Sequence, residues 1–189
     1  RLKRAGYRYL MTESPDRRGI DVALLYRHRR FHLICYDYLE VPPLPGMRPT
    51  RDILYVQGRR PSGDTLHVFV VHSPSRLGGE RQSLPNRHQV VVQLQQRPAE
   101  LGPSAHVIIT GDFNDYADSP ALLELYALGL HNATSSASGI HGEAHGTYRF
   151  RGEWHSLDHV LVSPLLYNRV DTAYINDAPF LLEDQPQYG

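Results

Sequence analysis

The chain has 189 residues, 41% of them hydrophobic, which is enough for one compact domain that buries roughly 70% of its unfolded surface. Twenty Lys and Arg residues balance twenty Asp and Glu residues, so the sequence lacks the strong basic excess of a general nucleic-acid binder. The single cysteine, Cys35, excludes an internal disulfide framework and a cysteine-rich zinc site, and no stretch approaches the ~18 apolar residues of a membrane span.

Five short runs of β-branched and aromatic residues predict strands, at residues 19–27, 31–41, 52–58, 65–73 and 105–112. Pro, Gly, Asp and Ser are frequent in the segments between them, where the chain must reverse. We therefore expect the first four strands to be successive antiparallel neighbours.

A helix is predicted from about residue 85 to residue 96. Pro85 suits its first turn, and Val90, Val91 and Leu94 form its apolar set. Pro98 is expected to end it.

A second helix should follow the fifth strand, with Ser119 as its cap, Pro120 at its first position and Gly129 after its end. Residues 146–152 and 157–163 then predict two more strands, joined by a tight turn at the sequence GEW. No repeat or linker divides the chain, so we expect a single domain.

The strand that ends at Asp112 leads directly into a polar cluster, GDFND. Because side chains alternate along a strand, Asp112 and Asn114 should point the same way while Phe113 faces the core. A carboxylate and an amide placed together suit a hard cation or a phosphoryl group. Such residues also commonly do no more than cap a turn, and the cluster alone leaves both interpretations open.

Three other polar residues stand at or near strand ends. His72 could hydrogen-bond a phosphate or protonate a leaving oxygen, or it could be an ordinary edge histidine. Arg76, in the loop that follows, could bind a phosphate through two hydrogen bonds or simply be solvated. Asp158 opens an otherwise apolar strand and needs a partner, which His72 would supply if the two strand ends meet.

Five blocks in this order resemble the endonuclease/exonuclease/phosphatase superfamily: SPDRRGIDVALLYR, RDIL, VHSPSRLGGE, ITGDFND and HGTYRFRGEWHSLDHVLVS. The resemblance covers nearly the whole chain. It implies a four-layered α/β sandwich, two mainly antiparallel sheets flanked by helices, with an active site at one edge of the sheets. The implied chemistry is hydrolysis of phosphoester bonds with Mg²⁺ or Mn²⁺, by a phosphodiesterase or nuclease, and nucleic acid is one candidate substrate. The alternative is a binding or interaction module that keeps the fold without the chemistry.

Four residues match catalytic positions of the family, namely His72, Asp112, Asn114 and Asp158. The resemblance implies that His72 binds the scissile phosphate and acts as an acid, and that Asp112 orients or deprotonates the attacking water. Asn114 would bind a phosphoryl oxygen, and Asp158 would support His72 or the metal site. Asp112 and Asn114 are the implied metal ligands, and they form a weak set.

Tyr26 and Arg76 are implied only as secondary phosphate contacts.

The family also uses an Asn and a Glu, the latter its chief metal ligand, upstream of where this sequence begins, and a final Ser-Asp-His block downstream of its end. The chain starts without Met and stops at EDQPQYG, so we expect residues 1–189 to be a domain that lacks both parts. Asp158 and His159 look like that last block, but Leu157 replaces its serine and the order of motifs differs. We therefore do not assign the catalytic histidine to His159, and the oligomeric state and cellular location are left open.

Overall fold

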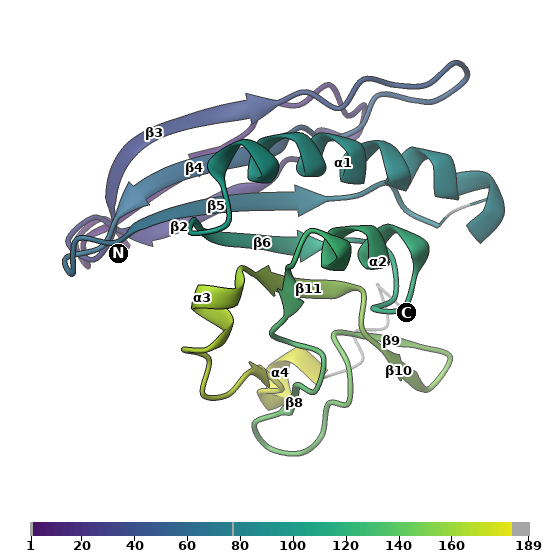
Figure 1. Cartoon of the computed structure of the whole chain (residues 1–189). Helices are drawn as coiled ribbons and strands as arrows, with labels where there is room; N and C mark the ends of the chain where they lie inside the picture. Colours follow the sequence, from purple (N-terminus) through teal and green to yellow (C-terminus); the bar gives the residue numbers. More distant parts are fainter. Residues whose placement is uncertain (1, 77, 183–189) are drawn as a thin grey trace.

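A six-stranded sheet forms the centre of the protein (Figure 1). The computed structural model describes residues 2–76 and 78–182, so the C-terminal sequence EDQPQYG lies outside the described residues. The strand order is β3-β4-β5-β6-β11-β7, and every neighbouring pair is antiparallel except β5 and β6. The strands are β3 (His32–Leu39), β4 (Ile53–Arg59), β5 (Thr65–His72), β6 (His106–Asp112), β7 (His131–Asn132) and β11 (Asp158–Val162).

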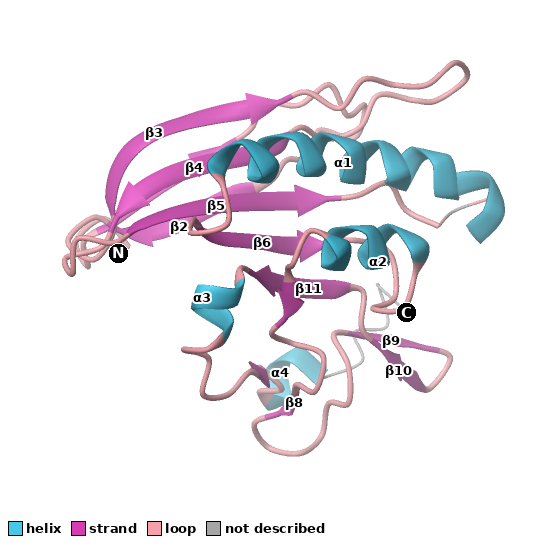
Figure 2. Ribbon diagram, in the orientation of Figure 1, coloured by secondary structure: helices cyan, strands magenta, loops and turns pink. Residues whose placement is uncertain are grey.

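Two helices, α1 (Glu80–Leu101) and α2 (Pro120–Ala127), cover one face of this sheet (Figure 2). The connection through α1 lets β5 and β6 run parallel. Apolar side chains of both helices, such as Leu94 and Leu122, pack with Phe69 and Ile109 of the sheet in one hydrophobic cluster. The core therefore lies between this helical layer and the sheet.

Helix α1 is longer than the sequence predicts, because Pro85 and Pro98 both lie inside it. Each proline removes one hydrogen bond of the helix. The helix nevertheless continues to Leu101, which packs against the same core as Leu94, and tertiary packing outweighs the local loss. Helix α2 begins as predicted, where the hydroxyl of Ser119 accepts a hydrogen bond from the amide of Leu122 (3.4 Å).

The opposite face of the sheet carries an antiparallel ribbon of β1 (Tyr7–Met11) and β2 (Ala23–Arg27). Val22 beside this ribbon packs with Leu54 and Val56 of β4. The expected pairing of β2 with β3 is wrong, because β2 pairs with β1, whereas the successive pairs β3–β4 and β4–β5 are confirmed. Strand β1 escaped prediction because most of its side chains are exposed, which leaves no apolar pattern.

The last third of the chain holds a small hairpin of β9 (Tyr148–Phe150) and β10 (Glu153–His155). Its turn lies at Arg151 and Gly152, both with positive φ (52° and 86°), the geometry of a two-residue hairpin turn. The sequence GEW was therefore wrongly expected to be a turn, since Glu153 and Trp154 belong to a strand. The other elements of this region are β8 (Ser138–Gly139), α3 (Pro164–Tyr167), β12 (Tyr174–Ile175) and α4 (Pro179–Leu182).

Helices, central sheet and ribbon form successive layers of an α/β sandwich, the fold class that the resemblance implies. Among the described residues, no helix combines the length and the apolar character needed to cross a lipid bilayer.

Candidate active site

Three candidate residues meet where β5, β6 and β11 lie side by side. Asp112 is the register partner of His72 on β5 and of Asp158 on β11. Residues paired in this way project from the same face of a sheet, here the face opposite α1 and α2. The Nε2 atom of His72 lies 3.7 Å from Oδ2 of Asp112. The structure thus brings an imidazole and two carboxylates together at one edge of the sandwich.

Asn114 joins this group through the turn that follows β6. Its backbone N–H donates to Oδ1 of Asp112 (2.7 Å), and its side-chain amide donates to the carbonyl of Ser73 (3.0 Å). Asn114 has a φ of 51°, which an asparagine tolerates better than most residues. Asp112 therefore caps the turn with one oxygen while its other oxygen remains near His72.

Gly111 allows β5 and β6 to approach closely beside the site. Its φ is 139°, and a Cβ atom there would collide with the carbonyl of Val71. Only a glycine fits this backbone. The register that places Asp112 next to His72 therefore depends on Gly111.

Burial and neighbouring charges change the acidity of the two central groups. Burial raises the pKa of Asp112, the Asn114 amide opposes this effect, and the carboxylate of Asp158 adds to it. Burial also lowers the pKa of His72, as does the nearby guanidinium of Arg51. Near neutral pH, His72 is therefore a neutral imidazole that can donate one hydrogen bond and accept another.

Arg51 is a site residue that the sequence analysis did not select. Its buried guanidinium donates to Oδ2 of Asp16 (2.9 Å) and to the carbonyl of Ser73 (2.8 Å). Burial would raise the pKa of Asp16, but hydrogen bonds from Arg18 and Arg51 lower it, so Asp16 stays charged. Arg51 thus places a fixed positive charge near His72. Arg51 stands two residues before β4, and the local sequence carries no signal for it, because its partners come from distant segments.

Arg76 lies at the rim of the same edge. It forms an ion pair with Glu80 (2.6 Å), and its guanidinium carbon lies 4.3 Å from the ring centre of Tyr116. Tyr116 follows the GDFND loop, and it too was missed because a tyrosine in a polar loop is not distinctive in the sequence.

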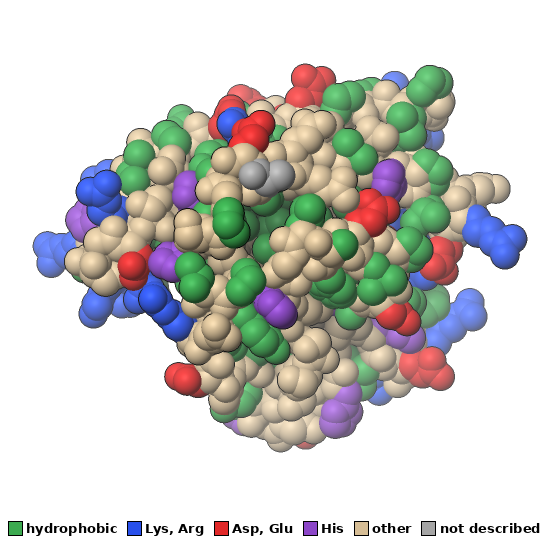
Figure 3. All heavy atoms as spheres, viewed as in Figure 1, with side chains coloured by type: hydrophobic (Ala, Val, Ile, Leu, Met, Phe, Trp, Pro, Cys, Tyr) green, Lys and Arg blue, Asp and Glu red, His purple; other side chains and the backbone are tan. Residues whose placement is uncertain are grey.

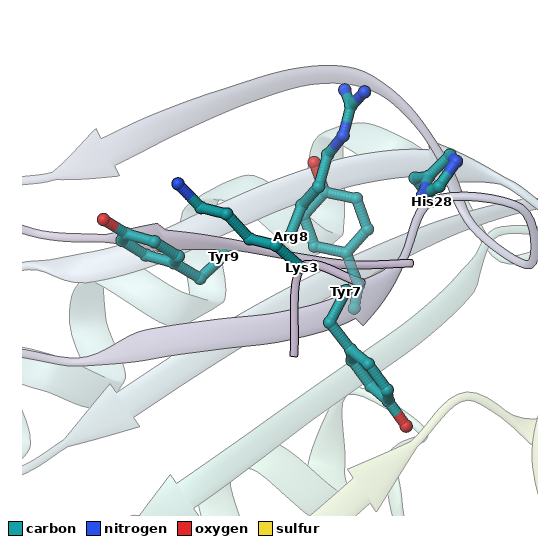
Figure 4. A pocket seen from close by; sticks show the side chains of 6 residues that line it. Lys3, Tyr7, Arg8, Tyr9 and His28 are labelled. Carbon is teal, nitrogen blue, oxygen red and sulfur yellow. The ribbon is translucent and has the colours of Figure 1, made fainter. Parts of the chain in front are cut away.

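The structure does not bring Tyr26 to this site. The Tyr26 ring packs edge-on against Phe31 (5.6 Å between ring centres), and the Phe31 ring covers Gly58, which pairs with Leu66 near the start of β5. At about 3.3 Å per residue, this end of β5 is roughly 20 Å from His72. Lys and Arg side chains gather at this end of the molecule (Figure 3). Tyr26 instead lines a cavity of about 430 Å³ with Lys3, Tyr7, Arg8, Tyr9 and His28 (Figure 4).

His159 occupies a structural position on the other face of β11. It is buried, and its Nε2–H donates to the carbonyl of Asp115 (2.9 Å) while Nδ1 accepts from the amide of Asn132 (3.1 Å). Burial lowers its pKa. Both ring nitrogens are therefore engaged within the protein, on the side away from Asp158.

The paired carboxylates are suited to a divalent cation. Asp112 and Asp158 face each other in register, and the carboxylate of Asp158 disfavours the ionisation of Asp112, an effect that a bound cation would relieve. Together with the Asn114 amide they offer the oxygen ligands that Mg²⁺ and Mn²⁺ prefer. The set is small, because the described residues contain no cluster of three or more His, Cys, Asp or Glu side chains with metal-binding geometry.

A sequence model described as the endonuclease/exonuclease/phosphatase family matches residues 1–185. A comparison with curated protein sequences finds no significant match.

Several solved structures are similar in fold. The human Nocturnin catalytic domain with bound sulfate has a TM-score of 0.65 at 20% identity, covering 86% of this chain and 62% of its own. The mannosyl-6-phosphatase of Bacteroides thetaiotaomicron has a TM-score of 0.63 at 20% identity, covering 84% and 63%. TDP2 of D. rerio in complex with single strand DNA product has a TM-score of 0.61 at 17% identity, covering 86% and 64%. The chain therefore spans less than two thirds of each of these structures.

Proposed function

Because the chain belongs to the endonuclease/exonuclease/phosphatase family, we propose that it hydrolyses phosphoester bonds, as a phosphodiesterase or nuclease. The observation that carries this proposal is the register of three strands, which aligns His72, Asp112 and Asp158 on one face. Folding does not require two carboxylates to stand side by side, and the repulsion between them lowers the stability of the fold. A catalytic role for the pair explains why they are placed together.

The substrate phosphate is expected to lie against His72 and Asn114. As a neutral imidazole, His72 can donate Nε2–H to a phosphoryl oxygen, and the negative charge of a bound phosphoester would favour its protonation. The guanidinium of Arg51, paired with Asp16, donates to the same Ser73 carbonyl as the Asn114 side chain, and so helps to position Asn114 for the phosphate. These groups account for binding of a phosphodiester before any bond breaks.

Asp112 is the candidate for orienting and deprotonating the attacking water. Its raised pKa makes it a better proton acceptor than an exposed carboxylate, and its Oδ1 is held by the amide of Asn114. Asp158 would keep His72 and Asp112 oriented from the neighbouring strand. A Mg²⁺ or Mn²⁺ ion held by Asp112, Asn114 and Asp158 would supply neutralisation of phosphoryl charge.

The solved neighbours include a mannosyl-6-phosphatase and TDP2 with a single strand DNA product, so the fold serves phosphomonoesters and nucleic acids alike. The test is hydrolysis of bis(p-nitrophenyl) phosphate with Mg²⁺ or Mn²⁺, with and without a chelator. We expect Asp112→Asn and Asn114→Ala each to lower turnover roughly 10²-fold while the fold survives.

Asp118→Asn is the matched control, since Asp118 is an exposed carboxylate in the same loop, and its turnover should stay within about twofold of the unmodified chain. Chelator-sensitive turnover that Asp112→Asn leaves unchanged would refute the site. A folded protein that binds phosphoesters without hydrolysing them would instead support the binding module.

A further inference from the structure

A row of aromatic rings and guanidinium groups leads from the candidate active site onto the β9–β10 hairpin. At its inner end, the guanidinium of Arg76 lies 4.3 Å from the ring centre of Tyr116. The Tyr116 ring in turn lies 5.6 Å from the ring of His155 on β10. These contacts link the loop after β5, the loop after β6 and the hairpin.

The row continues along the hairpin to its tip. Tyr148 is the register partner of His155, and its ring is nearly parallel to that of Phe150, at 12° and 6.1 Å between centres. The guanidinium of Arg151 then lies 5.1 Å from the Phe150 ring. Tyr148 and Phe150 are 43% and 50% exposed, so ring surface remains available to a ligand.

The hairpin is fixed to the catalytic edge at its base. The hydroxyl of Thr147 accepts hydrogen bonds from the amides of Leu157 and Asp158, both at 3.2 Å. Gly146 lies so close to the backbone of His155 that a Cβ atom would collide with it. The hairpin that carries the outer part of the row is therefore anchored directly beside Asp158.

We propose that this row binds the bases of a single-stranded nucleic acid whose phosphodiester lies at His72, Asp112 and Asp158. The inference rests on the proposed function and names its substrate. Bases of any sequence stack on aromatic rings, and arginines beside the rings neutralise the backbone phosphates. A duplex has its base faces already covered, and a lipid headgroup offers no planar ring, so exposed rings between guanidinium groups fit a single strand best.

The experiment measures binding in a chelator, where hydrolysis does not interfere. Trp154, the only tryptophan of the chain, lies on β10 with the guanidinium of Arg149 5.7 Å from its ring, and its fluorescence reports on the hairpin. The probes are a short oligodeoxythymidylate and an abasic strand of equal length. We expect the oligodeoxythymidylate to bind at least roughly tenfold more tightly, because stacking requires bases.

Variants locate the binding surface. Tyr148→Leu and Phe150→Leu should each weaken binding of the oligodeoxythymidylate roughly tenfold and leave the abasic strand nearly unaffected. Tyr36→Leu is the matched control, since Tyr36 is 49% exposed on β3, the first strand of the sheet. This variant should bind the oligodeoxythymidylate as tightly as the unmodified chain does. Unchanged Trp154 emission without ligand shows that the hairpin of a variant is intact.

Equal affinity for the two strands, or a hairpin variant that binds normally, would overturn the inference, and so would tighter binding of a duplex. Asp118→Asn should retain full binding. Base-dependent binding without any hydrolysis would support the row and refute the proposed function, whereas hydrolysis of bis(p-nitrophenyl) phosphate without base-dependent binding would do the reverse.

Discussion

Gly111 shows how one residue without a side chain can set the geometry of a site. Its backbone passes so near Val71 that any Cβ atom would force β5 and β6 apart. Gly111→Ala should therefore lower the free energy of unfolding by about 1–3 kcal/mol, the usual cost of an overpacked core position. It should also lower phosphodiester turnover at least about tenfold, since His72 and Asp112 would no longer align.

Gly142→Ala provides the control for Gly111→Ala. Gly142 also has a positive φ, 81°, but a Cβ atom there meets open space. The Gly142→Ala protein should lose only the free energy of unfolding that a positive φ costs an alanine, and its turnover should be unchanged. Urea unfolding and hydrolysis of bis(p-nitrophenyl) phosphate separate the two effects, and a fully active Gly111→Ala protein would contradict the role assigned to this glycine.

Those residues of the candidate site that stand at the end of an apolar strand could be predicted from the sequence. His72 and Asp112 each follow an apolar strand, so their position at a sheet edge was readable from the sequence. Arg51 was not, because its importance depends on a carbonyl and a carboxylate from distant segments. Tyr26 was misplaced for the same reason, since the sequence does not say which end of β5 its ring approaches.

At the level of elements, a buried ion pair ties α1 to the loop of the candidate site. Nε of Arg87 donates to Oδ2 of Asp115 (2.8 Å), and Nη1 donates to the hydroxyl of Ser83 (2.6 Å). Arg87→Met would leave the Asp115 carboxylate buried without its partner. We expect a loss of about 3–5 kcal/mol in the free energy of unfolding, which urea titration measures.

Arg97→Met is the matched control on the same helix, because Arg97 pairs with Asp37 and Glu100 at the surface. Its loss should stay below about 1 kcal/mol. Adding Asp115→Asn to Arg87→Met should recover part of the stability by removing the buried charge. If Arg87→Met were no more destabilising than Arg97→Met, the link between α1 and this loop would be unimportant.

Hydrogen bonds to a buried carboxylate also hold the segment after β8 to the segment after β12. The carboxylate of Asp177 accepts hydrogen bonds from the amides of His141 (2.9 Å), Glu143 (2.9 Å) and Ala144 (3.3 Å). Burial alone would raise the pKa of Asp177, but these amides lower it to about 2. A carboxyl with a lowered pKa stabilises the fold above its unfolded pKa of about 3.9, and this stabilisation disappears as the pH falls toward 2.

Asp177→Asn should consequently lower the melting temperature at pH 7, and the difference from the unmodified chain should shrink between about pH 4 and pH 2. Asp171→Asn, at an exposed aspartate nearby in the sequence, should leave the melting temperature unchanged. Thermal unfolding across this pH range is the measurement. If the difference in melting temperature stayed constant down to pH 2, the stabilisation by these three hydrogen bonds would not depend on the charge of Asp177.

Elements with a strong apolar pattern could be predicted, and elements stabilised by distant contacts could not. Strands β4, β5 and β6 are buried and were placed within two residues of their ends. The extension of α1 past Pro98 depends on packing against the sheet, and β1 depends on its pairing with β2. Neither cause is visible in a local window of sequence.

On the scale of the whole molecule, the two ends of the sheet differ in character. The candidate site and its aromatic row, with Arg76 and Arg151, lie at the end where β5 and β6 finish, and a further group of Lys and Arg side chains lies at the other end, on the left of Figure 3. The balanced total charge of the chain conceals these local groups. Composition could therefore exclude a uniformly basic protein but could not reveal where local charge lies.

The exposed face around β3 leads to a prediction about association. Strand β3 lies at the edge of the central sheet. Three apolar side chains here are about half exposed: Ile34 (48%) and Tyr36 (49%) on β3, and Met11 (51%) on β1. The hydroxyl of Tyr38 donates to the carbonyl of Met11 (2.9 Å), and the Tyr36 ring lies 5.7 Å from the Tyr38 ring, so exposed side chains of β1 and β3 lie next to one another. Exposed apolar edges favour contact between copies of a chain. We therefore expect association that increases with protein concentration, measured by sedimentation equilibrium.

Ile34→Lys should reduce this association strongly while changing the free energy of unfolding by less than about 1 kcal/mol, because a charge on an edge strand opposes pairing and the side chain is half exposed. Leu165→Lys is the matched control, since Leu165 is 44% exposed on α3, away from β3. It should associate like the unmodified chain. A protein that stays monomeric at every concentration, or one in which both variants associate equally, would show that the β3 surface does not drive self-contact.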